Sequence, residues 1–214
     1  MDNNIMLSLI NYFETLYEMN QKLIILCGDI FYFNSKKKLL EIIQDIPKVI
    51  PYSFNKNTCK LEFKEQDGIL EFKNKMTYLE QNLHEILKKH YDFLDKIRII
   101  RNKCQHKIHS VKHLGHFSGL SIEFEYEFLI EIQNNEHVLK VKSKEFIGLF
   151  KELNYLYSKM QNEVRRHNYK TGNAEVDAMY SRYHEKMSRF DFCKFNDIFD
   201  SELLQTFGQS MLDF

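Results

Sequence analysis

The stretch ILKKHYDFLDKIRIIRNKCQHKIHSV, residues 86–111, decides our prediction of the fold. Eight of its residues recur at a 4-3-4-3-4-4-3 spacing, and all of them except one histidine are apolar: Ile86, His90, Phe93, Ile97, Ile100, Cys104, Ile108 and Val111. An α-helix has 3.6 residues per turn, so this spacing gathers these side chains on one face. We therefore predict one long central helix from about residue 74 to residue 112.

The segments on both sides also show helical spacing of apolar residues. The further predicted helices cover residues 5–31, 35–46, 143–167 and 174–190, with a last short helix through Phe199, Leu203, Leu204 and Phe207. We expect Ser35 and Ser143 to cap the helices that they precede, and Pro47 to end the helix before it. The chain is therefore predicted to be a bundle of helices.

The apolar period changes from 3.6 to 2 after Gly119. From residue 120 to residue 132, apolar residues alternate with glutamates, which is typical of a strand with one face in water. A turn at Asn134-Asn135 would pair Ile130 with Leu139 and Glu127 with Lys142. Residues 51–72, with a turn signal at Asp67-Gly68, are compatible with a second, small hairpin.

These predictions give a mainly α fold, a helical bundle with a long central helix and one inserted β-hairpin at about residues 120–142. The chain of 214 residues is long enough to bury its own core, and 43% of it is hydrophobic, so we predict a single globular domain over residues 1–214. Its four cysteines are scattered without a C-x-x-C pair, which favours a reducing cytoplasm over a disulfide framework. We also expect no export signal and no membrane insertion.

The basic character of the chain is local. It has 30 Lys and Arg against 30 Asp and Glu, yet residues 88–113 contain eight Lys and Arg and two acids. On a regular helix the core stripe would face one way, and the polar residues opposite it would be Arg98, Asn102, His106, His109 and His113. Arg101 would lie at the flank of the stripe with its stem packed.

This set of residues suits phosphate chemistry. Arginine offers a permanent charge in a planar fork that fits phosphate oxygens, and histidine can give or take a proton near neutral pH. Lys103 and Lys107 would add attraction for phosphates without base specificity. Cleavage of RNA through its own 2′-hydroxyl needs these functions, an acid or base and a cation at the phosphorane.

The segment R-N-K-C-Q-H, Arg101 to His106, resembles the R-x4-6-H motif of the HEPN superfamily, in which a polar residue, often Asn, follows the Arg. The resemblance covers residues 85–115 in detail. It implies an α-helical domain that dimerises, so that two copies of the motif meet in a cleft that cuts RNA without a metal, frequently as a toxin or anti-phage effector. It also implies that Arg101 and His106 are catalytic and that Asn102 helps to orient them.

The motif poses a geometric problem on a regular helix. Arg101 and His106 are five residues apart, which separates them by roughly 140° around a straight helix. We therefore expect one of two solutions. Either the helix loosens near residues 104–107, or Arg101 of one chain works with His106 of a second chain across a twofold dimer.

Other interpretations of the same residues are open. The basic segment could be a solvated helix face whose arginine stabilises the helix C-terminus. Histidines at helical spacing could bind a metal instead: His106, His109, His113 and His116. We interpret His90 as a core histidine whose hydrogen bonds are satisfied, and we interpret the glutamates after residue 120 as a solvated sheet face partly neutralised by Lys140 and Lys142. A sharper interpretation is that this acidic face keeps nucleic acid away or folds onto the basic helix.

The sequence thus predicts a metal-independent endoribonuclease with Arg101, Asn102 and His106 as catalytic residues. The RNA-binding residues would be Arg98, Lys103, Lys107 and His109. No cofactor is expected, and the partners would be RNA, a second copy of the chain and, for a toxin, an antitoxin or other regulatory partner. The alternative is a non-catalytic helical module that binds nucleotides or proteins.

Overall fold

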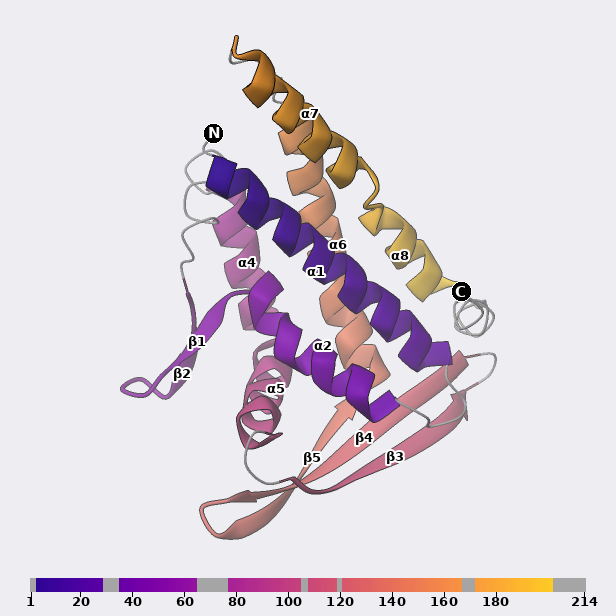
Figure 1. Ribbon diagram of the computed structural model, residues 1–214. Coiled ribbons are helices and arrows are strands. Elements are labelled where there is room, and N and C mark those ends of the chain that lie inside the picture. Colours follow the sequence, from indigo (N-terminus) through magenta and orange to yellow (C-terminus); the bar gives the residue numbers. More distant parts are fainter. Residues whose placement is uncertain are drawn as a thin grey trace.

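A computed structural model describes residues 3–28, 35–64, 77–104, 108–118, 121–166 and 172–201 (Figure 1). The fold is mainly helical, as predicted. Its helices are α1 Asn3–Gly28, α2 Ser35–Val49, α4 Thr77–Lys89, α5 Tyr91–Cys104, α6 Ser143–Arg166, α7 Ala174–Ser188 and α8 Phe192–Asp200. Its strands are β1 Tyr52–Asn55, β2 Lys60–Phe63, β3 Ile108–Ser118, β4 Ser121–Ile132 and β5 Asn135–Lys142.

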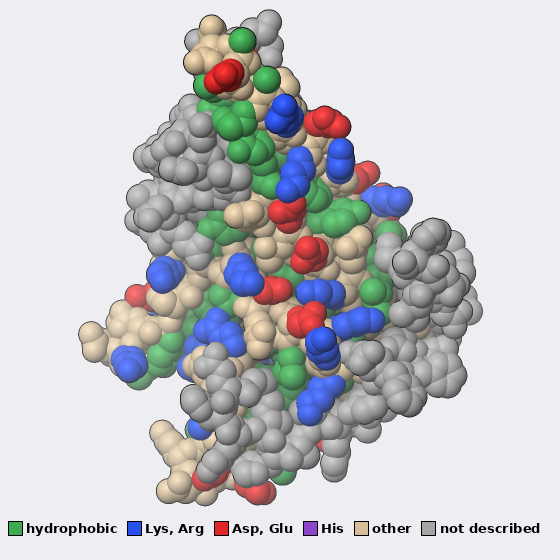
Figure 2. All heavy atoms as spheres, in the orientation of Figure 1, with side chains coloured by type: hydrophobic (Ala, Val, Ile, Leu, Met, Phe, Trp, Pro, Cys, Tyr) green, Lys and Arg blue, Asp and Glu red, His purple; other side chains and the backbone are tan. Residues whose placement is uncertain are grey.

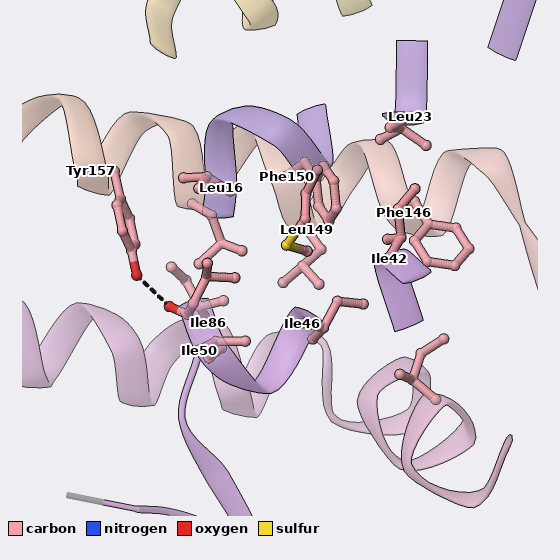
Figure 3. Close-up of a cluster of buried hydrophobic side chains, with 14 of the residues drawn as sticks. Leu16, Leu23, Ile42, Ile46, Ile50, Ile86, Phe146, Leu149, Phe150 and Tyr157 are labelled. Carbon is pink, nitrogen blue, oxygen red and sulfur yellow. Dashed lines mark hydrogen bonds between the residues drawn. The ribbon is translucent and has the colours of Figure 1, made fainter. Parts of the chain in front are cut away.

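The long α1 and α6 helices cross near the middle of the molecule, and the other helices pack around them (Figure 1). The apolar stripe predicted for α6 is buried in full: Phe146, Phe150, Leu153, Tyr157, Met160 and Val164. Figure 3 shows Phe146, Phe150 and Tyr157 of this stripe in the same cluster as Leu16 of α1, Ile46 of α2 and Ile86 of α4. Buried residues from α1 through α8 form one continuous apolar cluster, and its burial is the main stabilising contribution to the fold.

The prediction of one long central helix is wrong. Two helices, α4 and α5, meet at His90, and residues 108–118 form the strand β3. The spacing of Ile108 and Val111 suits either structure locally, but β3 pairs with β4 along its length, from Ile108–Ile130 to Ser118–Ser121. Because β4 offers this continuous partner, tertiary pairing overrides the helical spacing.

The inserted hairpin is therefore part of a three-stranded antiparallel sheet in the order β3-β4-β5. The apolar half of the alternation predicted for β4 is confirmed, since Phe124, Tyr126, Phe128 and Ile130 are buried. The opposite face is less exposed to water than predicted, because Glu125 is also buried. The predicted turn is wrong by one residue: Gln133 and Asn134 occupy it, with φ of 50° and 65°. Ile130 consequently pairs with His137, and Glu127 with Lys140. This register places Glu127 opposite Lys140 and Glu125 opposite Lys142, and it also places the like charges of Glu131 and Glu136 opposite each other.

Two smaller predictions also change. The α2 helix runs through Pro47 to Val49, because one missing N–H near a helix end removes a single hydrogen bond, and Ile50 still donates to the Ile46 carbonyl at 3.0 Å. A hairpin does form between residues 52 and 63, but it turns at residues 56–59, and Asp67-Gly68 lies outside the described residues. Leu203, Leu204 and Phe207 also lie outside them. In the described part of the chain, no helix combines the length and the apolarity that a membrane span requires.

Candidate functional site

The last turn of α5 carries the first half of the predicted motif. Arg101 is partly buried, Asn102 is exposed, and Lys103 is partly buried. The helix ends two residues before His106 in the sequence. The 140° between Arg101 and His106 applies only to a regular helix that runs through both residues. Because α5 ends before His106, this angle does not apply to them.

Arg98 lies one turn before Arg101 and is already engaged. Its Nε donates to Asp95 Oδ1 at 2.8 Å, and its guanidinium carbon lies 4.1 Å from the ring centroid of Phe54 on β1. Only 17% of its side chain is exposed. An arginine held by a carboxylate and an aromatic face is a fixed structural contact between α5 and β1. RNA binding as predicted would fall to its terminal N–H groups, because Nε is engaged by Asp95.

Arg101 differs from Arg98 in that it forms no hydrogen bond or ion pair with any described residue. An arginine that stabilises a helix C-terminus by capping donates to its last carbonyls, and none of the described hydrogen bonds does so. A partly buried guanidinium has already lost part of its hydration, so it gains from an anionic partner. Arg101 is therefore available to an oxygen-bearing ligand.

Tyr52 of β1 was not predicted to belong to the site, although the structure brings it there. Only 6% of it is exposed, and its hydroxyl has no hydrogen-bond partner among the described residues. Burial raises the pKa of Tyr52 to about 12, while Arg101 first and Arg98 second act to lower it. Phe54, two residues further along β1, lies against the Arg98 guanidinium, so the face of β1 that carries Tyr52 is turned toward α5. The alternation of Tyr52 and Phe54 was the available signal, since residues two apart on a strand share a face.

The end of the motif and the predicted RNA-binding residues that follow it lie mostly outside the described residues. This holds for His106 and Lys107 entirely, and for the side chain of His109. The backbone of His109 belongs to β3, at an irregularity in the pairing with β4. The prediction that His109 and His113 share a helix face with Asn102 is therefore wrong.

The alternative of a helical histidine metal site loses its geometric basis for the same reason. His113 and His116 stand on β3, opposite Tyr126 and Glu123 in the strand ladder. The i, i+3 and i+4 spacing brings side chains together on a helix and not on a strand. Elsewhere in the described chain, no group of three or more His, Cys, Asp or Glu side chains is close enough to hold a metal ion.

His90 lies at the junction of α4 and α5, with 13% of its side chain exposed. Its Nε2 is 3.4 Å from Glu152 Oε1 on α6 and forms no hydrogen bond with a described residue. Lys89 also contacts Glu152 Oε1. The histidine is thus mostly buried, as predicted, but it is not the satisfied core histidine that the sequence suggested, because its Nε2 has no hydrogen-bond partner among the described residues.

Charge is distributed unevenly over the described elements. Residues 35–64 and 91–104, which include α2, the β1–β2 hairpin and α5, carry eleven Lys and Arg against five Asp and Glu. Residues 121–142, the β4–β5 hairpin, carry five Glu against two Lys. Figure 2 shows Lys and Arg side chains over the β1–β2 hairpin and the nearby end of α2. A phosphate backbone would be attracted to the first region.

The acidic face of β4 is neutralised from β5. Lys140 contacts Glu125 at 3.1 Å and Glu127 at 2.5 Å, and Lys142 contacts Glu125 at 2.9 Å. Hydrogen bonds from Lys142 and Lys140 hold the pKa of Glu125 below its usual value. Hydrogen bonds to Glu127 and Glu125 raise the pKa of Lys140. These groups satisfy one another.

The chain was compared with protein-family models, with curated proteins and with solved structures, and none of the three comparisons found a match.

Proposed function

We propose that this protein is a metal-independent endoribonuclease of the HEPN type, with Arg101, Asn102 and His106 as its catalytic residues. The observation that supports it most directly is the state of Arg101. Its guanidinium is partly buried at the end of α5, inside the motif that resembles the family, and it has no partner among the described residues. The proposal gives it that partner, the phosphate that is cut.

The proposed reaction is attack of a ribose 2′-oxygen on the adjacent phosphorus, with departure of the 5′-oxygen of the next nucleotide. His106 would move the proton, either from the 2′-hydroxyl or to the leaving oxygen. Arg101 would stabilise the extra negative charge on the phosphorane oxygens, where a fixed cation acts most strongly. Asn102, exposed beside Arg101, would orient these groups.

The charge distribution supports RNA as the substrate class. The basic elements are α2, the β1–β2 hairpin and α5. The α5 helix carries Arg101, and it contacts both α2 and Phe54 of the hairpin. Exposed lysines of this region include Lys56, Lys60 and Lys64 of the hairpin. Because they attract phosphates without contacting bases, they would hold an RNA strand in place without selecting a sequence.

The proposal includes a homodimer with a composite active site, in the cytoplasm of a cell in which the enzyme acts as a toxin or an antiviral effector. Two inactive variants test the composite site. If Arg101 of one chain works with His106 of the other, mixing Arg101→Ala with His106→Ala protein restores about a quarter of the parental activity, because about half of the dimers are mixed and each has one intact site. No restoration would place both residues of a site in one chain.

The central experiment measures cleavage of single-stranded RNA by the purified full chain in EDTA. We expect cleavage by the parent, and a loss of about a hundredfold or more in Arg101→Ala and in His106→Ala. The matched controls are Arg182→Ala on α7 and His137→Ala on β5, both exposed and both expected to cleave like the parent. Loss of activity in EDTA, or full activity of His106→Ala, would refute the proposal.

The alternative, a non-catalytic module that binds nucleotides or proteins, predicts a different result. Under it, the parent would bind a single-stranded oligonucleotide but leave RNA intact, and Arg101→Ala would weaken binding alone. Folding of each variant is checked by thermal unfolding, so that a lost activity is not a lost structure.

A further inference from the structure

Two buried tyrosine hydroxyls of this protein are in opposite situations. The hydroxyl of Tyr157 on α6 donates to the Val49 carbonyl at 2.6 Å, as Figure 3 shows. The hydroxyl of Tyr52, only three residues beyond Val49, is just as inaccessible and has no partner among the described residues. A buried polar group without a partner is costly, and it commonly marks the place of a water, an ion or a ligand.

The position of Tyr52 is set by the contact of β1 with α5. Tyr52 and Phe54 are two residues apart on β1, and the Phe54 ring lies against the Arg98 guanidinium. A second contact holds the same hairpin, because the Tyr91 hydroxyl at the start of α5 accepts a hydrogen bond from the Leu61 amide at 3.2 Å. The face of β1 that carries Tyr52 is thereby fixed against the arginine side of α5.

The charges near the Tyr52 hydroxyl are unequal in their availability. Asp95 and Arg98 are paired with each other at 2.8 Å, so neither offers a free charge. Arg101 follows Arg98 by one turn on α5, the helix that this face of β1 contacts, and it has no partner among the described residues. Because burial and the neighbouring charges leave the pKa of Tyr52 at about 12, the phenol keeps its proton at neutral pH and can act only as a donor to an anion.

We propose that the Tyr52 hydroxyl and the Arg101 guanidinium together bind one phosphate group, each donating to a different oxygen. A phosphate satisfies both donors at once, because it is tetrahedral and offers several acceptor oxygens. The inference rests on the proposed function for the source of the phosphate, which is then the phosphodiester of an RNA strand. Tyr52 becomes a substrate-binding residue supplied by an element remote from the motif in sequence.

The route to the site follows from the exposure of its two members. Arg101 is partly exposed, and Tyr52 is buried. A phosphate therefore reaches Arg101 first and contacts the phenol after a local movement of the surrounding side chains. This order makes Arg101 necessary for binding and makes Tyr52 a contributor to its strength.

The test uses Tyr52→Phe, which removes one oxygen and keeps the packing of the ring. The matched control is Tyr155→Phe on α6, whose side chain is 58% exposed. The binding of two probes to the full chain is measured: inorganic phosphate and a single-stranded 2′-O-methyl oligonucleotide. The oligonucleotide has phosphodiesters but no nucleophilic 2′-hydroxyl, so it cannot be cut. Thermal unfolding without ligand is measured for each variant.

We expect Tyr52→Phe to weaken the binding of the oligonucleotide about tenfold, because a hydrogen bond to a charged group is removed. Its melting temperature without ligand should equal or exceed that of the parent, since an unsatisfied buried group is removed. If Tyr52→Phe weakens the binding of both probes, the site recognises a phosphate group by itself. If it weakens only the binding of the oligonucleotide, the site recognises the phosphate as part of a nucleic-acid strand. Tyr155→Phe should match the parent throughout.

Three outcomes would overturn the inference. The first is unchanged binding by Tyr52→Phe, and the second is no binding of either probe by the parent. The third is a melting temperature of Tyr52→Phe several degrees below that of the parent, which would show that the hydroxyl has a structural partner. Because neither probe can be cleaved, these measurements test binding independently of catalysis. If the protein binds both probes through Tyr52 but does not cut RNA, the proposed function is refuted and the phosphate site stands.

Discussion

The β4–β5 hairpin and the end of α5 are both charged, but they use charge in opposite ways. On the hairpin, Lys140 and Lys142 are paired with Glu125 and Glu127 across the strands. At the end of α5, Arg101 has no described partner. Charges that satisfy one another stabilise the local structure, whereas an unsatisfied charge with reduced hydration favours a ligand. Pairing therefore distinguishes the candidate site better than the amount of charge does.

The largest expected effect tests this difference on nucleic-acid binding. Replacing Lys56, Lys60 and Lys64 of the β1–β2 hairpin together by Gln should weaken binding of a single-stranded 2′-O-methyl oligonucleotide by about tenfold or more at low salt. It should also reduce the slope of log affinity against log salt by about 0.7 for each phosphate that the variant no longer neutralises. Affinity is measured by titration over a series of salt concentrations.

The matched variant replaces Lys140 and Lys142 of the β4–β5 hairpin by Gln. Because these lysines are occupied by glutamates, the oligonucleotide affinity and its salt slope should stay within twofold of the parent. Equal effects in the two variants would mean that pairing does not separate the regions, and that only overall charge matters.

The second effect compares two arginines one turn apart on α5. Arg98→Ala should lower the free energy of unfolding by about 1 kcal/mol, because it removes a partly buried ion pair with Asp95 and a contact with the Phe54 ring. Arg101→Ala should leave this free energy within about 0.5 kcal/mol of the parent, as expected for a side chain that no described residue contacts through a hydrogen bond or ion pair. Urea unfolding measures both, and a larger decrease for Arg101→Ala would assign it a structural role.

The sequence predicts those parts of this fold whose pattern has one physical interpretation. The stripe of α6 and the apolar face of β4 are unambiguous, and both are confirmed. The segment 108–118 is ambiguous, because its apolar spacing suits a helix while its pairing with a distant strand makes it β3. No local pattern contains that partner, so the error is one of tertiary context.

The same limit applies to the candidate site. The motif from Arg101 to His106 can be found because its residues are close in the chain. The roles of Arg98 and Tyr52 cannot, because both depend on the contact of β1 with α5, and these elements are separated by almost forty residues. A turn that is shifted by one residue has the same origin, since the register is set by the pairing of β4 with β5 along their whole length and not by the turn residues alone.

The smallest expected effect tests the paired region alone, through Glu125. Lys142 and Lys140 lower the pKa of this carboxyl in the folded chain, so its ionised form stabilises the fold. That contribution is present above the unfolded-state pKa, near 4.5, and is lost as the pH falls through the lower folded-state pKa. Glu125→Gln should therefore cost on the order of 0.5 kcal/mol at pH 7, after solvent screening, and nothing at a pH below the folded-state pKa. Urea unfolding of parent and variant at both pH values measures the difference, with Glu136→Gln, an exposed residue of β5, as the control. If Glu125→Gln still lowers the free energy of unfolding in acid, the carboxyl acts through packing and not through its charge. The ion pairs of this hairpin would then not account for the small effect on oligonucleotide binding that we expect from replacing Lys140 and Lys142.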